Sequence, residues 1–188
     1  MWSEMSIRKI LSWLPRAVYN SHMITSNSSL EMIIGSLLRS RGLKLATAES
    51  CTGGLLADYI TNIPGSSVYF VGGVVAYAYE AKAALLHVSW DTLRLKGAVS
   101  RETVIEMARG VRTVLGADIG VSVSGIAGPG CGLPEKPVGT TWIGLSSRNG
   151  DWARMFTWNG DRRANKEASA QSALQFILDY LEKKLEND

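Results

Sequence analysis

The sequence predicts an α/β fold in which a mixed sheet is covered by helices on both faces within a single compact domain. Three observations lead to this prediction. Helical and strand patterns alternate along the chain from residue 28 onward. The segment "ADIGVSVSG" is apolar at nearly every position, as in strands that are buried on both faces. The 188 residues, 46% of them apolar, suffice for one substantial core.

The first predicted elements are a helix, a strand and a second helix. Ser28 and Glu31 form a capping-box pattern, and apolar residues then follow at helical spacing until Gly42. Residues 43–48 read as a strand, and "GGLLADYIT", beginning at Gly53, reads as a helix. The intervening "SCT" is therefore a strand-to-helix turn.

The segment "SVYFVGGVVAYAYEAKAALL" repeats this arrangement, with a strand over 68–77 and a helix after it. Tyr77 and Lys82 lie near this second junction. A third helix is expected over 101–115, with Ser100 as its N-cap.

A loop over 125–137 follows the buried strand and precedes the strand "VGTTWIGLSS". A loop of that length in a compact domain is typical of a functional segment. "WARMFTW" is expected to pair with the preceding strand through the turn "RNGD", and residues 161–185 form a terminal helix.

Residues 1–27 precede this domain, which we place at 28–188. Apolar residues at helical spacing indicate an amphipathic helix, although Pro15 interrupts the pattern, and a targeting peptide has a compatible composition. We expect a non-catalytic extension.

Composition narrows the class of protein. The net charge of +3, from 20 basic and 17 acidic residues, is small and dispersed, so nucleic acid is not an expected partner. Cys51 and Cys131 are far apart, which favours neither a zinc site nor a disulfide framework and indicates a reducing cytoplasm. No apolar stretch reaches the roughly 20 residues of a membrane helix, and no membrane partner is expected.

Ser50 has two readings. Serine is a common N-cap residue, so Ser50 alone is more typical of a helix cap than of a nucleophile. Only two histidines occur in the chain, so an activated serine needs another base. Lys82 is the candidate if burial lowers its pKa, with Tyr77 close enough to hydrogen-bond the same hydroxyl. From spacing alone, a solvated lysine and a packed tyrosine are the simpler reading.

A series of motifs favours the interpretation of Ser50 as a nucleophile over that of a helix cap. "TAESCTGG", "PGSS", "EAK", "GAVS", "SGIAGPG", "PEKPVGTTWIGL" and "NGDR" occur in this order over residues 28–185. In these motifs the chain resembles the CinA carboxy-terminal family, the nicotinamide mononucleotide deamidases. The resemblance implies a cytoplasmic hydrolase of pyridine nucleotide recycling, a homo-oligomer (dimer or higher) that needs no metal or other cofactor. Its nucleophile, tyrosine and lysine fall on Ser50, Tyr77 and Lys82.

The substrate implied by this resemblance is a small nucleotide, and its anionic group needs donors. In an α/β sheet, ligands bind beyond the carboxyl ends of the strands, where glycines and the N–H groups of a helix start can contact an anion or oxyanion. The expected substrate-binding residues are Thr52, Gly53, Gly54, Gly125, Ala127, Gly128, Gly130, Lys136 and Arg162. A surface salt bridge with Asp161 or Glu167 is the alternative role of Arg162.

The chain departs from the family pattern next to the expected site. It reads "YAYEAK" where "YSNEAK" is usual, so Ala78 and Tyr79 replace a hydroxyl and an amide, and Lys166 stands in place of an arginine. We expect a changed pocket wall and weaker substrate binding, with Tyr79 either stacked on a pyridine ring or pointing outward. Two other functions stay open: an inactive nucleotide-binding protein of this fold, and a protein that docks to a partner through its amino-terminal helix.

Overall fold

The computed structural model describes residues 29–130 and 132–185. The predicted amino-terminal extension lies outside the described residues, as do Ser28 and Cys131.

One sheet of five strands organises the described chain, in the order β2-β1-β3-β4-β5. The strands are β1 (Leu45–Glu49), β2 (Phe70–Val75), β3 (Ile119–Gly125), β4 (Thr140–Ser147) and β5 (Gly150–Thr157). β1 is parallel to both β2 and β3, whereas β3, β4 and β5 are successively antiparallel. The sheet is therefore mixed, as predicted.

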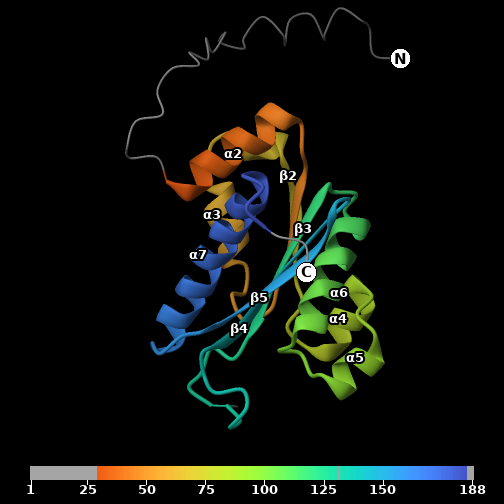
Figure 1. Cartoon of the computed structure of the whole chain (residues 1–188), viewed down its shortest axis with the longest axis vertical. Coiled ribbons are helices and arrows are strands. Elements are labelled where there is room, and N and C mark those ends of the chain that lie inside the picture. The colour runs from red at the N-terminus through yellow and green to blue at the C-terminus, as the bar shows by residue number, and fades with distance from the viewer. Residues whose placement is uncertain (1–28, 131, 186–188) are drawn as a thin grey trace, which may run out of the picture.

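Helices cover both faces of this sheet (Figure 1). The described helices are α2 (Leu30–Arg41), α3 (Leu55–Thr61), α4 (Tyr79–Leu86), α5 (Trp90–Leu95), α6 (Arg101–Val114) and α7 (Arg162–Leu181), with a 3₁₀ turn at Ser66–Val68. α2, α3 and α7 lie on one side of the sheet, and α4, α5 and α6 lie on the other.

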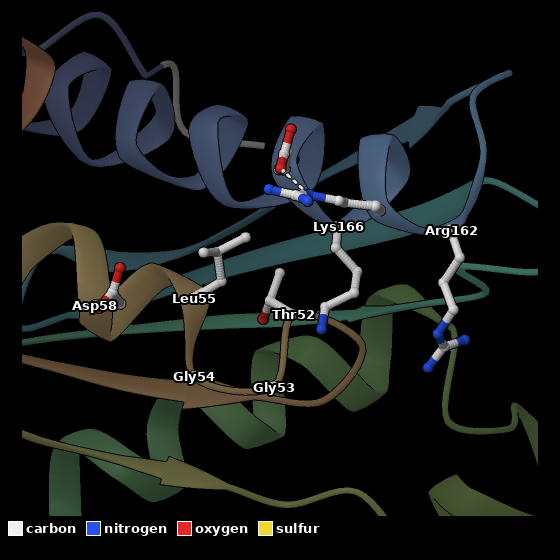
Figure 2. A pocket seen from close by; sticks show the side chains of 9 residues that line it. Thr52, Gly53, Gly54, Leu55, Asp58, Arg162 and Lys166 are labelled. Atoms are coloured by element: carbon white, nitrogen blue, oxygen red, sulfur yellow. Dashed lines mark hydrogen bonds and ion pairs between the residues drawn. The ribbon is translucent and has the colours of Figure 1, made fainter.

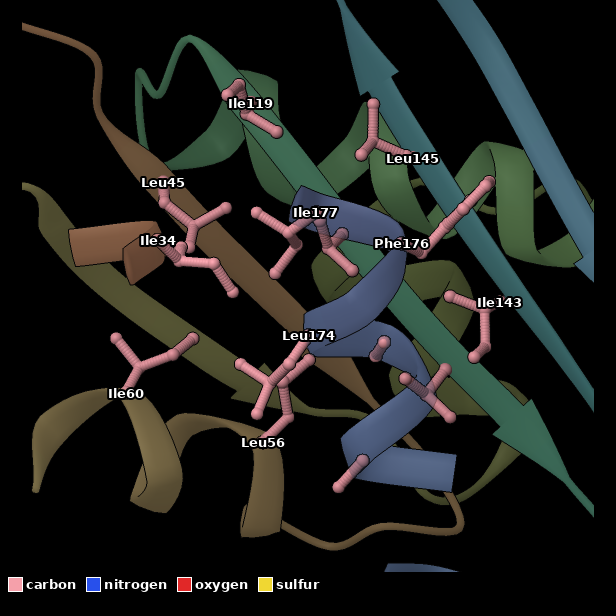
Figure 3. Packing of buried hydrophobic residues seen from close by; sticks show 14 of the residues in the cluster. Ile34, Leu45, Leu56, Ile60, Ile119, Ile143, Leu145, Leu174, Phe176 and Ile177 are labelled. Carbon is pink, nitrogen blue, oxygen red and sulfur yellow. The ribbon is translucent and has the colours of Figure 1, made fainter. Parts of the chain in front are cut away.

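Each helical layer buries its own apolar cluster against the sheet. The larger cluster joins α2, α3 and α7 to the sheet and includes Leu56, Leu174 and Ile177 (Figure 3). β1 is buried at every position and serves both clusters, because Leu45 packs in the larger one and Ala46 in the smaller one. Such continuous burial explains why this strand shows no alternation in its sequence.

The chain connections place a topological switch point at the end of β1. From β1 the chain passes through α3 to β2 on one side, and from β2 it returns through α4, α5 and α6 to β3 on the other side. In such sheets the point where the strand order reverses, beyond the carboxyl ends, is where ligands bind. Ser50 lies at that point, and its N–H donates to the carbonyl of Val123 in β3 at 2.9 Å.

The predicted α/β class, mixed sheet and two-sided helical cover are confirmed, but two local predictions are wrong and one helix was not predicted. The N-cap of α2 is Ser29 and not Ser28. α3 begins at Leu55, because Gly53 and Gly54 have φ values of 64° and 101° that no helix residue adopts. The sequence reasoning missed α5 altogether. Among the described residues, no helix is both long and apolar enough to cross a membrane.

Candidate active site

Ser50 and Lys82 are in direct contact at the end of β1. The Lys82 Nζ lies 3.0 Å from the Ser50 Oγ, although the two residues are 32 positions apart. Ser50 is 7% exposed and Lys82 is fully buried. The expected proximity of serine and lysine is thus present, and a buried pair at hydrogen-bond distance is the geometry that proton transfer requires.

Two main-chain carbonyls complete the surroundings of the lysine. Its Nζ donates to the oxygen of Ala76 at 2.8 Å and to that of Tyr77 at 3.0 Å. Both carbonyls lie just after β2, and Lys82 itself comes from the first turns of α4. Burial lowers the pKa of Lys82 to about 8, because removing water disfavours the charged amine.

Cys51, the neighbour of Ser50, is an alternative nucleophile by chemistry. Its thiol is buried, and loss of hydration raises its pKa to about 12. A thiol that stays protonated is a poor nucleophile. The hydroxyl of Ser50, unlike this thiol, has a recorded hydrogen bond to the buried Lys82 amine, so Ser50 is the stronger candidate in this turn.

Glu49 fixes the turn that carries Ser50. Its carboxylate, 1% exposed, accepts hydrogen bonds from the N–H groups of Gly54, Leu56 and Ala57 at 2.9, 3.1 and 2.9 Å. The expectation that the start of this helix offers free N–H groups to an anion is wrong, since Glu49 already occupies them. The motif contained Glu49, but no sequence pattern assigned this role to it.

Within the turn, other N–H groups remain. The Gly53 N–H donates to the Ser50 carbonyl at 3.2 Å. Among the described residues, no acceptor is recorded for the N–H groups of Cys51 and Thr52. The N–H groups of Cys51 and Thr52 are therefore the main-chain donors that this turn has left for an oxyanion.

The Tyr77 side chain does not meet the expectation that it bonds the serine hydroxyl. The residue is 62% exposed, and its hydroxyl accepts a hydrogen bond from the Arg162 guanidinium at 3.1 Å. Arg162 also donates to the Gly128 carbonyl at 2.6 Å. Tyr77 thus contacts Lys82 through its main chain and Arg162 through its side chain. Neither alternative salt bridge of Arg162 is recorded among the ion pairs of the described residues.

A cleft of about 670 Å³ opens beside the Ser50 turn, between α3 and the start of α7 (Figure 2). It is lined by Thr52, Gly53, Gly54, Leu55, Asp58, Arg162, Arg163, Lys166 and Glu167. Four predicted binding residues belong to this lining. Sequence reasoning missed the other five, which lie on the facing sides of two helices. Ser50 is two residues from Thr52 and is not itself part of the cleft wall.

The predicted residues of the Gly-rich loop lie on the far side of Arg162. Ala127 and Gly128 line a second cavity of about 460 Å³, which Arg162 also lines. Gly125 is the last residue of β3, and Gly130 is exposed. Arg162 therefore separates two cavities, with the Ser50 turn beside one and this loop beside the other.

Lys136 is not at the cleft. Its Nζ donates to the Lys96 carbonyl at 2.8 Å, in the connection between α5 and α6. The expectation that Lys136 binds the substrate is not supported by this position, because its side chain is already engaged by another part of the fold.

Ala78 and Tyr79 do not line the cleft either. Ala78 is the N-cap residue of α4 and makes no side-chain cap bond. Tyr79 is 39% exposed, and its hydroxyl accepts a hydrogen bond from the Ala98 N–H at 3.2 Å. The Tyr79 side chain is thus held by the segment that precedes α6, and neither residue contacts this cleft in support of the expected change in the pocket wall.

No group of three or more His, Cys, Asp or Glu side chains suited to a metal ion occurs in residues 29–130 and 132–185.

Comparisons with known proteins agree on one family. The model of the CinA C-terminal domain matches residues 27–181. The chain is 48% identical over 161 residues to a CinA-like protein of Chloroherpeton thalassium. This alignment covers 84% of this chain and 38% of that protein. The chain thus spans well under half the length of that relative.

Solved structures show the same fold. A CinA superfamily protein from Klebsiella pneumoniae has a TM-score of 0.79 and 34% identity, covering 82% of this chain and 96% of the other. A competence/damage inducible protein from Agrobacterium tumefaciens has a TM-score of 0.75 and 37% identity, with 85% and 99% covered.

Proposed function

We propose that this chain, which belongs to the CinA C-terminal domain family, is an amidohydrolase that converts nicotinamide mononucleotide to nicotinic acid mononucleotide and ammonia. The observation that carries the proposal is the buried contact of 3.0 Å between Ser50 Oγ and Lys82 Nζ. The substrate is the one implied by the motifs that the chain shares with the nicotinamide mononucleotide deamidases.

Three acceptor oxygens surround the Lys82 Nζ, which donates to all three as an ammonium and to two of them as a neutral amine. A neutral amine has two N–H donors and one lone pair, whereas an ammonium has three donors. In the neutral form, the carbonyls of Ala76 and Tyr77 take the two donors, and the lone pair then accepts a hydrogen bond from the Ser50 hydroxyl. With a pKa of about 8, about one molecule in ten holds Lys82 in this neutral form at pH 7.

In the first half of the reaction, Lys82 takes the proton of Ser50 while the Ser50 Oγ attacks the carboxamide carbon. The N–H groups of Cys51 and Thr52 stabilise the oxyanion, since the N–H groups of the helix start are engaged by Glu49. The Lys82 ammonium then protonates the amide nitrogen, the C–N bond breaks, and ammonia leaves an ester on Ser50.

In the second half, a water molecule attacks the ester carbon and gives a proton to Lys82. The bond between Ser50 Oγ and the carbonyl carbon breaks, and Lys82 returns the proton to Ser50. The cycle consumes one water and leaves both side chains as they began. It requires no metal ion at any step.

Ammonia release from nicotinamide mononucleotide, with a chelator present, tests this proposal. We expect turnover by the wild-type chain and a loss of several orders of magnitude in Ser50→Ala, as removal of a nucleophile usually gives. Ser66→Ala is the matched control, because Ser66 lies in the 3₁₀ turn away from the cleft, and it should retain wild-type turnover.

Two results would contradict the proposal. Near wild-type turnover by Ser50→Ala would exclude the covalent mechanism. Binding of the nucleotide without any ammonia release by the wild-type chain would favour the inactive nucleotide-binding protein that the sequence left open.

A further inference from the structure

Three cationic side chains line the cleft, and two of them already have partners. Arg163 forms an ion pair with Glu167 at 3.0 Å. Arg162 donates to Gly128 and Tyr77. For Lys166, no hydrogen bond or ion pair is recorded within residues 29–130 and 132–185. Lys166 is thus the cation of the cleft that is available to a ligand.

The Lys166 side chain crosses the cleft toward the Ser50 turn. It extends from α7 toward Gly53 (Figure 2), and its Nζ lies 3.6 Å from the position that a Cβ on Gly53 would occupy. Gly53 has a φ of 64°, and the absence of a side chain there leaves the space below the ammonium open. An anion at this place would contact both the cation and the turn.

A buried hydroxyl lies in the same wall of the cleft. Thr52 is 1% exposed, and its Oγ1 has no hydrogen-bond partner among the described residues. Buried polar atoms are normally paired, so an unpaired hydroxyl in a cleft wall points to a ligand that completes it. Thr52 and Lys166 together offer an O–H donor and a cation.

We infer that Lys166 and Thr52 form the subsite for a phosphate monoester, the anionic group of a mononucleotide. This inference rests on the proposed function. The site does not depend on the start of α3, whose N–H groups are bound by Glu49. A phosphate carries nearly two negative charges and three acceptor oxygens, which match one ammonium and one hydroxyl.

The position of the subsite also fits one substrate molecule. Thr52 is two residues after Ser50, on the same turn, so a phosphate at Thr52 lies within the length of one nucleotide from the reactive pair.

Steady-state kinetics with two substrates test the subsite. For Lys166→Met we expect the KM for nicotinamide mononucleotide to rise at least about tenfold, the effect of one charge-assisted hydrogen bond, with little change in kcat. Nicotinamide riboside, which lacks the phosphate, should be hydrolysed by this variant as by the wild type. Lys166→Arg should keep most of the affinity, because it keeps the cation.

The control for the lost charge is Lys183→Met, since Lys183 is exposed beyond the end of α7 and away from the cleft. It should behave as the wild type with both substrates. An equal loss with the nucleotide and the riboside in Lys166→Met would overturn the inference, because the lysine would then serve something other than phosphate.

Binding of inorganic phosphate, followed by calorimetry, separates this inference from the proposed function. Weaker phosphate binding in Lys166→Met, in a chain that releases no ammonia, would refute the deamidase and support the subsite. Turnover of the nucleotide with phosphate binding and KM unchanged by Lys166→Met would refute the subsite and support the deamidase.

Thr52→Val supplies a second variant with a distinct signature. It keeps the branched shape and removes the unpaired hydroxyl, so the melting temperature should be equal to or above that of the wild type. Phosphate binding should nevertheless weaken. A lower melting temperature together with unchanged phosphate affinity would assign Thr52 a structural role and contradict the inference for this residue.

Discussion

Lys82 and Ser50 come from two different strand-to-helix junctions, and each side chain is held by its own backbone surroundings. The two carbonyls that follow β2 orient the lysine amine, and Glu49 fixes the turn that carries the serine. Both groups are therefore in place before any substrate binds, which is the arrangement that lowers the cost of reaching a reactive geometry.

Different effects are expected from substitution of Lys82 and of Tyr77. Lys82→Met removes the proposed base and should reduce kcat by a factor of about a hundred to ten thousand. Tyr77→Phe should reduce turnover much less, because its hydroxyl contacts Arg162 and only its main-chain carbonyl contacts Lys82. Measured kcat values for the two variants check this order, and a larger loss in Tyr77→Phe would mean that the tyrosine itself transfers the proton.

The sequence could indicate Ser50 and Lys82 because motifs mark them, but it could not indicate which contacts their neighbours make. Glu49 directly precedes Ser50 in the chain, yet its carboxylate accepts hydrogen bonds from N–H groups five to eight positions further along. Lys136 has the right charge for a phosphate and is held by the Lys96 carbonyl instead. The hydrogen-bond partners of Glu49 and Lys136 depend on the path of the backbone in three dimensions.

At the scale of single elements, Glu49 links β1 to α3. Glu49→Gln leaves one acceptor oxygen for three N–H donors and should lower the free energy of unfolding by about 1–3 kcal/mol. Urea denaturation measures this change, with Glu135→Gln as the control, because Glu135 is exposed in the loop between β3 and β4. Equal stability of the two variants would show that the carboxylate is not what holds the turn.

The N-terminus of α4 lacks a capping side chain, because Ala78 stands there. Ala78→Ser should raise the free energy of unfolding by about 1 kcal/mol, since serine is a favoured N-cap residue. The KM for nicotinamide mononucleotide should stay the same, because Ala78 does not line the cleft. Ala84→Ser, in the body of α4, is the control and should bring no such gain. A lower KM without added stability in Ala78→Ser would contradict this account and would indicate that the residue at this position contacts the substrate.

Element positions were predictable where periodicity is strong, as for α6, whose Ser100 cap was expected and accepts from the Thr103 N–H. Prediction failed where glycine geometry decides a boundary, as at Gly53 and Gly54 before α3. It also failed for α5, whose six residues are too few to show a helical period.

At the scale of the whole molecule, the two helical layers share one sheet. β1 contributes Leu45 to one apolar cluster and Ala46 to the other, so loss of this strand removes packing contacts from both clusters. We expect a single unfolding transition that coincides in circular dichroism and tryptophan fluorescence. Two separated midpoints would show that the layers unfold independently.

The ordered motifs predicted the family of this chain. The match of the CinA C-terminal domain model over residues 27–181 confirms that prediction. The cleft itself was only partly predictable, because its two walls come from segments more than a hundred residues apart, 52–58 and 162–167. Arg162 was expected from the motif "NGDR", whereas Lys166 was noted only as a departure from the family pattern, in place of an arginine. The packing of α7 against α3 turns these positions toward one another.

The pH dependence of kcat/KM for nicotinamide mononucleotide tests the central claim, that a neutral Lys82 activates Ser50. Burial lowers the pKa of this amine from 10.5 to about 8, and the neutral fraction rises as the pH increases. The account predicts a rate that rises about tenfold per pH unit below pH 8 and then levels off, since a single deprotonation is required. The phosphate of the substrate titrates near pH 6 and does not produce this inflection. A rate that is constant through pH 8, or that falls as the pH rises through it, would contradict the account.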